Sequence, residues 1–186
     1  MSDYAVTDTT ARSYTGVAKG LHWLILALVL IQYVTKLMPP GAMTKQQLNA
    51  WHVAVGPAVL LVMLLRLAWR LTHTPPPAPR DLSPLLQIVS RATHWAFYAI
   101  LILLPIGGWI ALSFYGGRPT LLGLFPLPTL ADKNKALGET WGQIHGVFAW
   151  VLLALIGLHV LGALYHLVVK KDGVIGRMLP GEPLSP

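Results

Sequence analysis

The chain has 186 residues, of which 54% are hydrophobic and only 11% charged, and its mean hydropathy of +0.58 excludes an ordinary soluble domain. The absence of cysteine excludes disulfides, thiolate metal sites, iron–sulfur clusters and a covalently attached c-type haem. The net charge of +7 does not indicate nucleic-acid binding, because the seven Trp lie within or at the ends of apolar runs, away from the Lys and Arg.

Four apolar segments are each long enough to cross a bilayer as a helix, which takes about 20 residues. In chain order they cover residues 17–38, 49–71, 85–114 and 138–169. Connections rich in proline and glycine separate them and end the helices. The sequence therefore predicts an all-α integral membrane protein, a four-helix bundle that forms a single domain over residues 1–186.

The basic residues are unevenly divided between the two ends of this bundle. Nine of the fourteen fall on the side that carries both termini: Arg12, Lys19, Arg66, Arg70, Arg80, Arg91, Lys170, Lys171 and Arg177. The positive-inside rule puts this side in the cytoplasm. We expect the first segment to stay in place and not to be cleaved as a signal peptide, since no small-residue cleavage site follows it. The tail from about Lys170 is expected to be loosely ordered.

Histidines are concentrated in these segments. Six of the seven lie inside or at the ends of a segment: His22, His52, His94, His145, His159 and His166. Polar groups are costly there and usually functional, although a hydrogen bond between helices explains any one of them equally well. Because successive segments alternate in direction, depths can be compared. His22 and His159 fall at similar depth near the cytoplasmic side, and His52 and His145 near the outer side.

The fourth segment can contribute to both pairs. His145 and His159 are separated by about 21 Å along a helix axis and lie within about 40° of one face. Two kinds of metal site are considered for these histidines. A closed zinc site requires four clustered ligands, whereas a haem with two axial histidines requires one imidazole on each side of its ring. Small residues flank the paired histidines: Gly56, Gly142, Gly146, Gly157 and Gly162. They either let a macrocycle approach the backbone or let helices pack closely.

The chain resembles the bacterial cytochrome b561 family, four-span cytochromes with two haems in the cytoplasmic membrane. The resemblance covers nearly the whole length, through "LHWLI" at His22, "WHVAVGPAVLLVMLLRLAWRL" at His52, "THWAFYAILILLPIGGWIA" at His94, "GQIHG" at His145 and "IGLHVLGALYHLVVKKDGVIGRMLP" at His159. It implies a place in the bacterial inner membrane. It also implies that His22 and His159 are the axial ligands of an inner haem b, and His52 and His145 those of an outer one.

Haems with both axial positions filled would transfer single electrons. A lipid-soluble quinone such as ubiquinone is the expected acceptor, because it reaches the protein through the bilayer and takes up protons as well as electrons. Three residues near the cytoplasmic side are candidates for quinone contacts or proton delivery, namely His94, His166 and Arg91. Contacts to haem propionates and ordinary bonds between helices are the alternatives for these residues.

The electron donor is suggested by the family, which includes a superoxide oxidase, so that the chain is expected to be a superoxide:ubiquinone oxidoreductase. Four cations in the outer loops are candidates for steering the superoxide anion: Lys45, Arg118, Lys133 and Lys135. Solvation of the loops or pairing with propionates explains these charges equally well.

Two other functions are compatible with the pattern. The first is a cytochrome subunit that relays electrons between the quinone pool and a partner dehydrogenase or hydrogenase, as similar b cytochromes with four or five spans do. No long docking segment is present, which favours the oxidase. The second is a scaffold without cofactor or a metal transporter, which requires the histidine depths to agree by coincidence.

Overall fold

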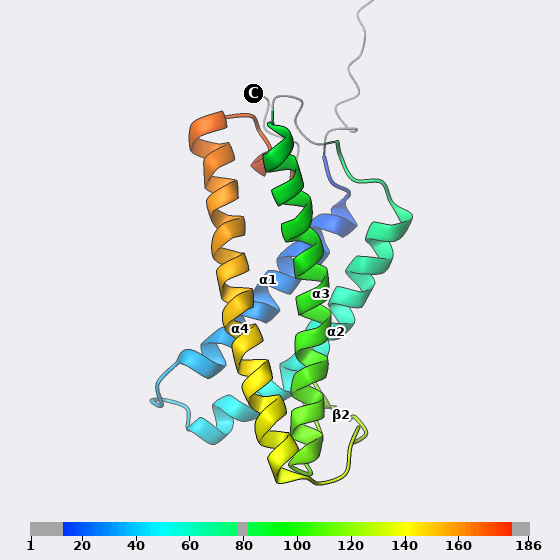
Figure 1. Cartoon of the computed structure of the whole chain (residues 1–186), viewed down its shortest axis with the longest axis vertical. Helices are drawn as coiled ribbons and strands as arrows, with labels where there is room; N and C mark the ends of the chain where they lie inside the picture. The colour runs from blue at the N-terminus through cyan, green and yellow to red at the C-terminus, as the bar shows by residue number, and fades with distance from the viewer. Residues whose placement is uncertain (1–12, 78–81, 180–186) are drawn as a thin grey trace, which may run out of the picture.

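The computed structural model describes residues 13–77 and 82–179 (Figure 1). It contains four long helices, α1 (Gly16–Leu37), α2 (Lys45–Thr72), α3 (Pro84–Phe114) and α4 (Lys135–Leu164). The connection from α3 to α4 holds an antiparallel hairpin of β1 (Thr120–Leu121) and β2 (Phe125–Pro126). Beyond α4 follow a π-helical turn, η2 (Tyr165–Lys170), and a 3-10 turn, η3 (Ile175–Arg177). Arg12 and Arg80, which entered the charge comparison, lie outside the described residues.

All four helices are long and apolar enough to cross a membrane. The prediction of an all-α protein with four spans is therefore confirmed. The largest difference in a helix start is at α2, which begins at Lys45 and not at 49. The reason is a capping box that the apolar pattern does not reveal: the Gln47 amide donates to Thr44 Oγ1 (3.2 Å), and the Thr44 amide donates to Gln47 Oε1 (2.8 Å).

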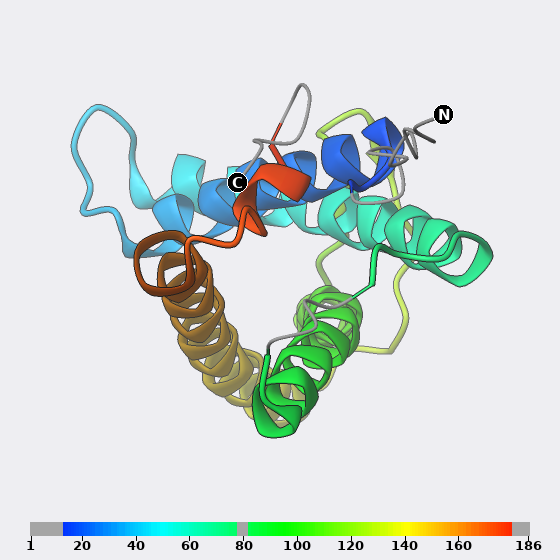
Figure 2. The ribbon, with the colours of Figure 1, turned by 90° about the horizontal axis from the view of Figure 1, so that it is seen from above.

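The helices are arranged as two hairpins that meet mainly through α2 and α3. Helix α1 packs along α2, and α3 packs along α4. Seen from above, the four helices surround the middle of the bundle (Figure 2). The buried core is centred on α2, where Val55, Val59 and Met63 are almost fully enclosed. Across the bundle, the Tyr33 hydroxyl of α1 donates to the Ala149 carbonyl of α4 (2.5 Å) and so connects the two hairpins.

The segment that follows Lys170 makes contacts with the start of the chain as far as residue 179, which the sequence did not predict. Trp23 Nε1 donates to the Met178 carbonyl (2.9 Å), and the Tyr14 amide donates to the Arg177 carbonyl (3.2 Å). These contacts fold the tail back over the start of α1. Both bonds are accepted by backbone carbonyls of the tail. Every residue has such a carbonyl, so the sequence does not show which of them will be hydrogen-bonded.

Candidate functional site

Four histidines meet in two pairs across the bundle. The inner pair, at the end that carries the termini, consists of His22 on α1 and His159 on α4, with ring centroids 6.2 Å apart. The outer pair consists of His52 on α2 and His145 on α4, with centroids 6.0 Å apart. All four residues are half-buried. The structure thus brings together the histidines whose depths agree in the sequence.

The spacing within each pair suits an iron atom between two imidazoles. An imidazole nitrogen binds a transition metal at about 2 Å, which puts the centroids of two imidazoles on opposite sides of one iron about 6 Å apart. Within the described ranges, no group of three or more His, Asp or Glu side chains is placed to hold a metal ion. Each pair therefore offers two ligands, the number that a haem needs and half of what a closed zinc site needs.

In the outer pair, a hydrogen bond orients the ring of His145 but not that of His52. His145 Nδ1 lies 3.0 Å from the Leu104 carbonyl, so this nitrogen carries the proton and Nε2 is left free to bind. Gln32 Nε2 donates to the His52 carbonyl (3.2 Å), while His52 Nδ1 is buried without a partner among the described residues. A buried ring nitrogen of this kind requires a ligand or water. Gly108 lies against the His145 ring, since a Cβ built there would be 2.9 Å from Cε1.

Aromatic rings, by contrast, pack around the inner pair. The His159 ring lies 5.6 Å from that of His94 and 5.5 Å from that of Phe97, both edge to face. His94 Nδ1 is 2.6 Å from the Ser90 carbonyl, so its other nitrogen is free to face a ligand. His94 is therefore the one of the three quinone candidates that the structure places beside a histidine pair.

The glycines near the α4 histidines leave space along that helix. A Cβ built on Gly142, Gly146, Gly157 or Gly162 would meet no atom within 4 Å. Gly56 differs, since its Cβ would lie 3.5 Å from a side-chain nitrogen on α1. Four of the five glycines thus leave room beside the backbone, where a macrocycle or a lipid chain fits.

His166 and Arg91, the other two quinone candidates, lie apart from the pairs. His166 Nδ1 is 2.7 Å from Asp172 Oδ2, and the Val174 amide donates to Asp172 Oδ1 (3.2 Å). Partial burial raises the pKa of Asp172, but these hydrogen bonds outweigh it and the pKa lies below its usual value. Arg91 is exposed, and among the described residues it makes no hydrogen bond or ion pair with a histidine of either pair.

All four cations that were predicted to steer superoxide are exposed at the outer end. Lys45 starts α2, whereas Arg118, Lys133 and Lys135 belong to the connection between α3 and α4 and to the start of α4. Lys135 Nζ lies 3.8 Å from the Glu139 carboxylate, which offsets part of its charge.

Sequence reasoning missed Lys36, whose charge acts on both histidines of the outer pair. It lies in the last turn of α1 and donates from Nζ to Asn49 Oδ1 (2.9 Å). The sequence does contain a signal, because a lysine at the outer end of the first apolar helix falls at the depth of Asn49, about one helical turn from His52.

Comparison with known proteins identifies the family of the chain. Residues 13–181 match the family described as prokaryotic cytochrome b561. The probable superoxide oxidase CybB of Yersinia pestis is 32% identical over 171 residues, which are 91% of this chain and 97% of that protein. Cytochrome b561 homolog 2 of Escherichia coli K12 is 29% identical over 182 residues, 93% and 94% of the two chains. Homolog 1 of the same organism is 28% identical over 168 residues, 86% and 93%.

These matches extend over nearly the whole chain, including both histidine pairs and all four helices. Such a family implies haem b, a multi-pass place in a bacterial membrane and a role in electron transfer. The chain belongs to the prokaryotic cytochrome b561 family.

Proposed function

We propose that the protein oxidises superoxide at its outer end and reduces a quinone, ubiquinone being the first to test, in the bacterial inner membrane. In this proposal it binds two haems b, one at the inner pair and one at the outer pair. The observation that carries the proposal is the geometry of the pairs, with ring centroids 6.2 Å and 6.0 Å apart at two depths of one bundle. A haem with two imidazole ligands has no open position for dioxygen and passes single electrons.

The overall reaction balances with two protons as the only further reactant. Two superoxide anions each lose one electron and become dioxygen, and one quinone takes up the two electrons and two protons to become a quinol. The donor is a small anion in water, and the acceptor is dissolved in lipid. Two sites at different depths of the bundle suit this pair of substrates, and the name of the Yersinia pestis relative supports superoxide as the donor.

On the donor side, the basic residues of the outer end would attract the anion. Arg118, Lys133 and Lys45 are exposed, and Lys36 is the lysine whose charge reaches both His52 and His145. A local positive potential raises the concentration of an anion at the surface and its association rate. The role of these residues is to guide superoxide, while the imidazoles hold the group that accepts the electron.

On the acceptor side, His94 is the favoured contact for the quinone. Its Nδ1 donates a hydrogen bond to the Ser90 carbonyl. Its Nε2, beside His159, can therefore accept a hydrogen bond or a proton. The His166–Asp172 pair and Arg91 remain proposals for proton delivery from the aqueous side. His94, His166 and Arg91 all belong to the half of the bundle near the termini.

The test is to mix the purified protein with superoxide and a soluble ubiquinone analogue and to follow the haem absorbance bands. We expect two haems per chain with a low-spin b-type spectrum, reduction by superoxide and reoxidation by the quinone. Higher ionic strength should slow the superoxide step. A colourless preparation would refute haem binding. Failure of superoxide to reduce a correctly loaded protein would reject the oxidase and favour the cytochrome subunit that serves a partner dehydrogenase or hydrogenase.

A further inference from the structure

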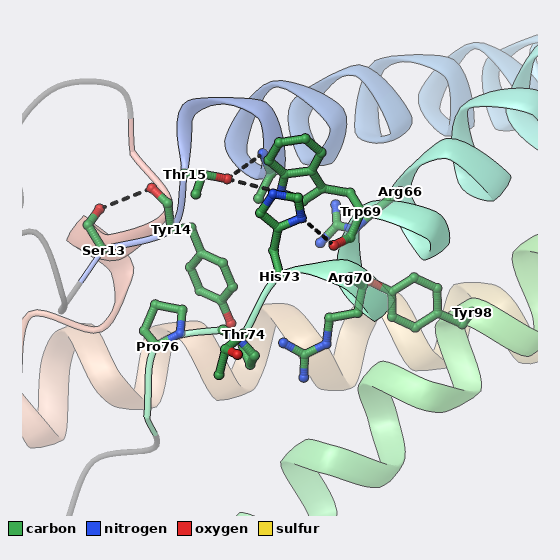
Figure 3. A pocket seen from close by; sticks show the side chains of 12 residues that line it. Ser13, Tyr14, Thr15, Arg66, Trp69, Arg70, His73, Thr74, Pro76 and Tyr98 are labelled. Carbon is green, nitrogen blue, oxygen red and sulfur yellow. Dashed lines mark hydrogen bonds between the residues drawn. The ribbon is translucent and has the colours of Figure 1, made fainter.

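A pocket of about 370 Å³ lies at the end of the bundle that carries the termini (Figure 3). Its walls come from the start of α1, from the last turns of α2 with the loop that follows, and from Tyr98 on α3. Thr15 caps the start of α1 and His73 caps the end of α2. Because these helices leave the membrane here, the pocket lies at the boundary between lipid and water.

Two arginines give this pocket a concentrated positive charge. Arg66 and Arg70 are one helical turn apart on α2, and both are half-buried and line the pocket. Like charges at this spacing repel each other. Among the described residues, neither guanidinium has a hydrogen bond or an ion pair, and no Asp or Glu lines the pocket. An anion between the two would remove the repulsion.

The rest of the wall is held in place by the protein itself. Trp69 Nε1 donates to Thr15 Oγ1 (3.1 Å), and the Trp69 ring stacks on His73 with centroids 3.7 Å apart and planes 10° from parallel. The Ser13 hydroxyl donates to the Arg177 carbonyl (3.3 Å) and so attaches the chain before α1 to the C-terminal tail. Figure 3 shows the Trp69 and His73 side chains next to each other, with Arg66 and Arg70 among the other side chains that line the pocket. These contacts join the start of α1, the end of α2 and the C-terminal tail along one wall of the pocket.

The two arginines face different neighbours. Both arginines line the first pocket. Arg70 also lines a second hollow of about 300 Å³ together with Leu71, whose side chain is 69% exposed. Arg66 is not among the residues that line the second hollow. Arg70 is thus the cation placed between the pocket and an apolar surface.

We propose that this pocket binds the phosphate group of an anionic phospholipid, with Arg70 as its main contact. A guanidinium binds phosphate through two parallel hydrogen bonds, which a lysine cannot reproduce. Basic pockets between helix ends are known sites for anionic headgroups, and Trp and Tyr side chains favour the same depth of the membrane. The exposed Leu71 favours a lipid over free phosphate, because acyl chains can cover it.

The test compares Arg70→Gln with Arg91→Gln. Arg91 is an exposed arginine of α3 at the same end of the bundle, and it does not line the pocket. Each protein, loaded with haem, is incubated with vesicles of phosphatidylglycerol or of phosphatidylcholine, extracted in mild detergent and weighed by native mass spectrometry. We expect the wild type and Arg91→Gln to retain one phosphatidylglycerol, and Arg70→Gln to bind it about tenfold less tightly or weaker. Phosphatidylcholine should be retained poorly by all three.

Glycerol phosphate, the headgroup fragment without acyl chains, separates a lipid site from a phosphate site. The proposal predicts weak competition by this fragment, and equally tight binding of the fragment would overturn it. Equal retention of phosphatidylglycerol by Arg70→Gln and wild type would also overturn it, and a changed haem spectrum in that variant would then assign Arg70 to a haem carboxylate. Should Arg70→Gln not fold, Arg70→Lys keeps the charge and must still weaken retention. None of these outcomes depends on superoxide or quinone turnover.

Discussion

The two histidine pairs are held in different ways. In the outer pair, a hydrogen bond from His145 Nδ1 to the Leu104 carbonyl sets the direction of the ring. In the inner pair, neither ring of His22 or His159 has a hydrogen bond among the described residues, and neighbouring rings surround His159 instead. One outer imidazole, that of His145, is therefore oriented by a specific bond, while the inner ones depend on packing. The two pairs should respond differently to substitution.

Loss of a paired histidine should have the largest effect, because in the proposed function it removes one of two iron ligands. We expect alanine at any of the four positions to reduce the haem content from two to one per chain, measured by absorbance of the extracted haem. His52→Ala and His145→Ala should leave the same spectrum, that of the inner haem. His22→Ala and His159→Ala should leave the other. Any different grouping of the four residual spectra would contradict the pairing.

Gly108→Ala should come next, and it should affect the outer pair alone. A Cβ there would lie 2.9 Å from His145 Cε1, so the ring must turn and its bond to Leu104 is lost. Loss of such a supporting bond weakens metal-site affinity by about 10- to 100-fold. We expect weaker retention of the outer haem and a changed electron paramagnetic resonance signal from it. Gly107→Ala is the matched control, because its Cβ would meet Trp141 at an ordinary 3.9 Å. Equal behaviour of the two variants would remove Gly108 from the site.

Lys36→Gln should have a moderate effect on the superoxide reaction. Lys36 is the lysine whose charge reaches both outer histidines, whereas Lys135 is 84% exposed and paired with Glu139. We expect the rate constant for reduction by superoxide to fall by about three- to tenfold in Lys36→Gln, with a weaker dependence on ionic strength. Lys135→Gln should change it far less. A larger effect from Lys135 would place the entry of superoxide at the connection between α3 and α4.

The sequence predicted the fold well, because four spans follow from hydropathy and helix length alone. It also predicted which histidines meet, since depth depends only on residue number and chain direction. It could not predict how they are held: the partner of His145 is the Leu104 carbonyl, and every residue has a carbonyl. Gly108 was missed because two adjacent glycines in an apolar helix are usually explained by close packing of helices. Asp172 was missed because it lies in a tail that has no apolar pattern.

The His166–Asp172 bond joins this missed residue to η2 at the end of α4 and should give the smallest effect. Asp172→Asn keeps an acceptor but loses the charge, so we expect a loss of about 1 kcal/mol and a lower melting temperature at neutral pH. The folded state depresses the pKa of Asp172, so its stabilisation is present above the usual value of 3.8 and is lost as the pH falls through the lower folded value. The difference between the two proteins should therefore close on acidification. Because the tail receives a hydrogen bond from Trp23, next to His22, any haem loosened in this variant should be the inner one. Loosening of the outer haem instead would show that the tail does not support the inner pair.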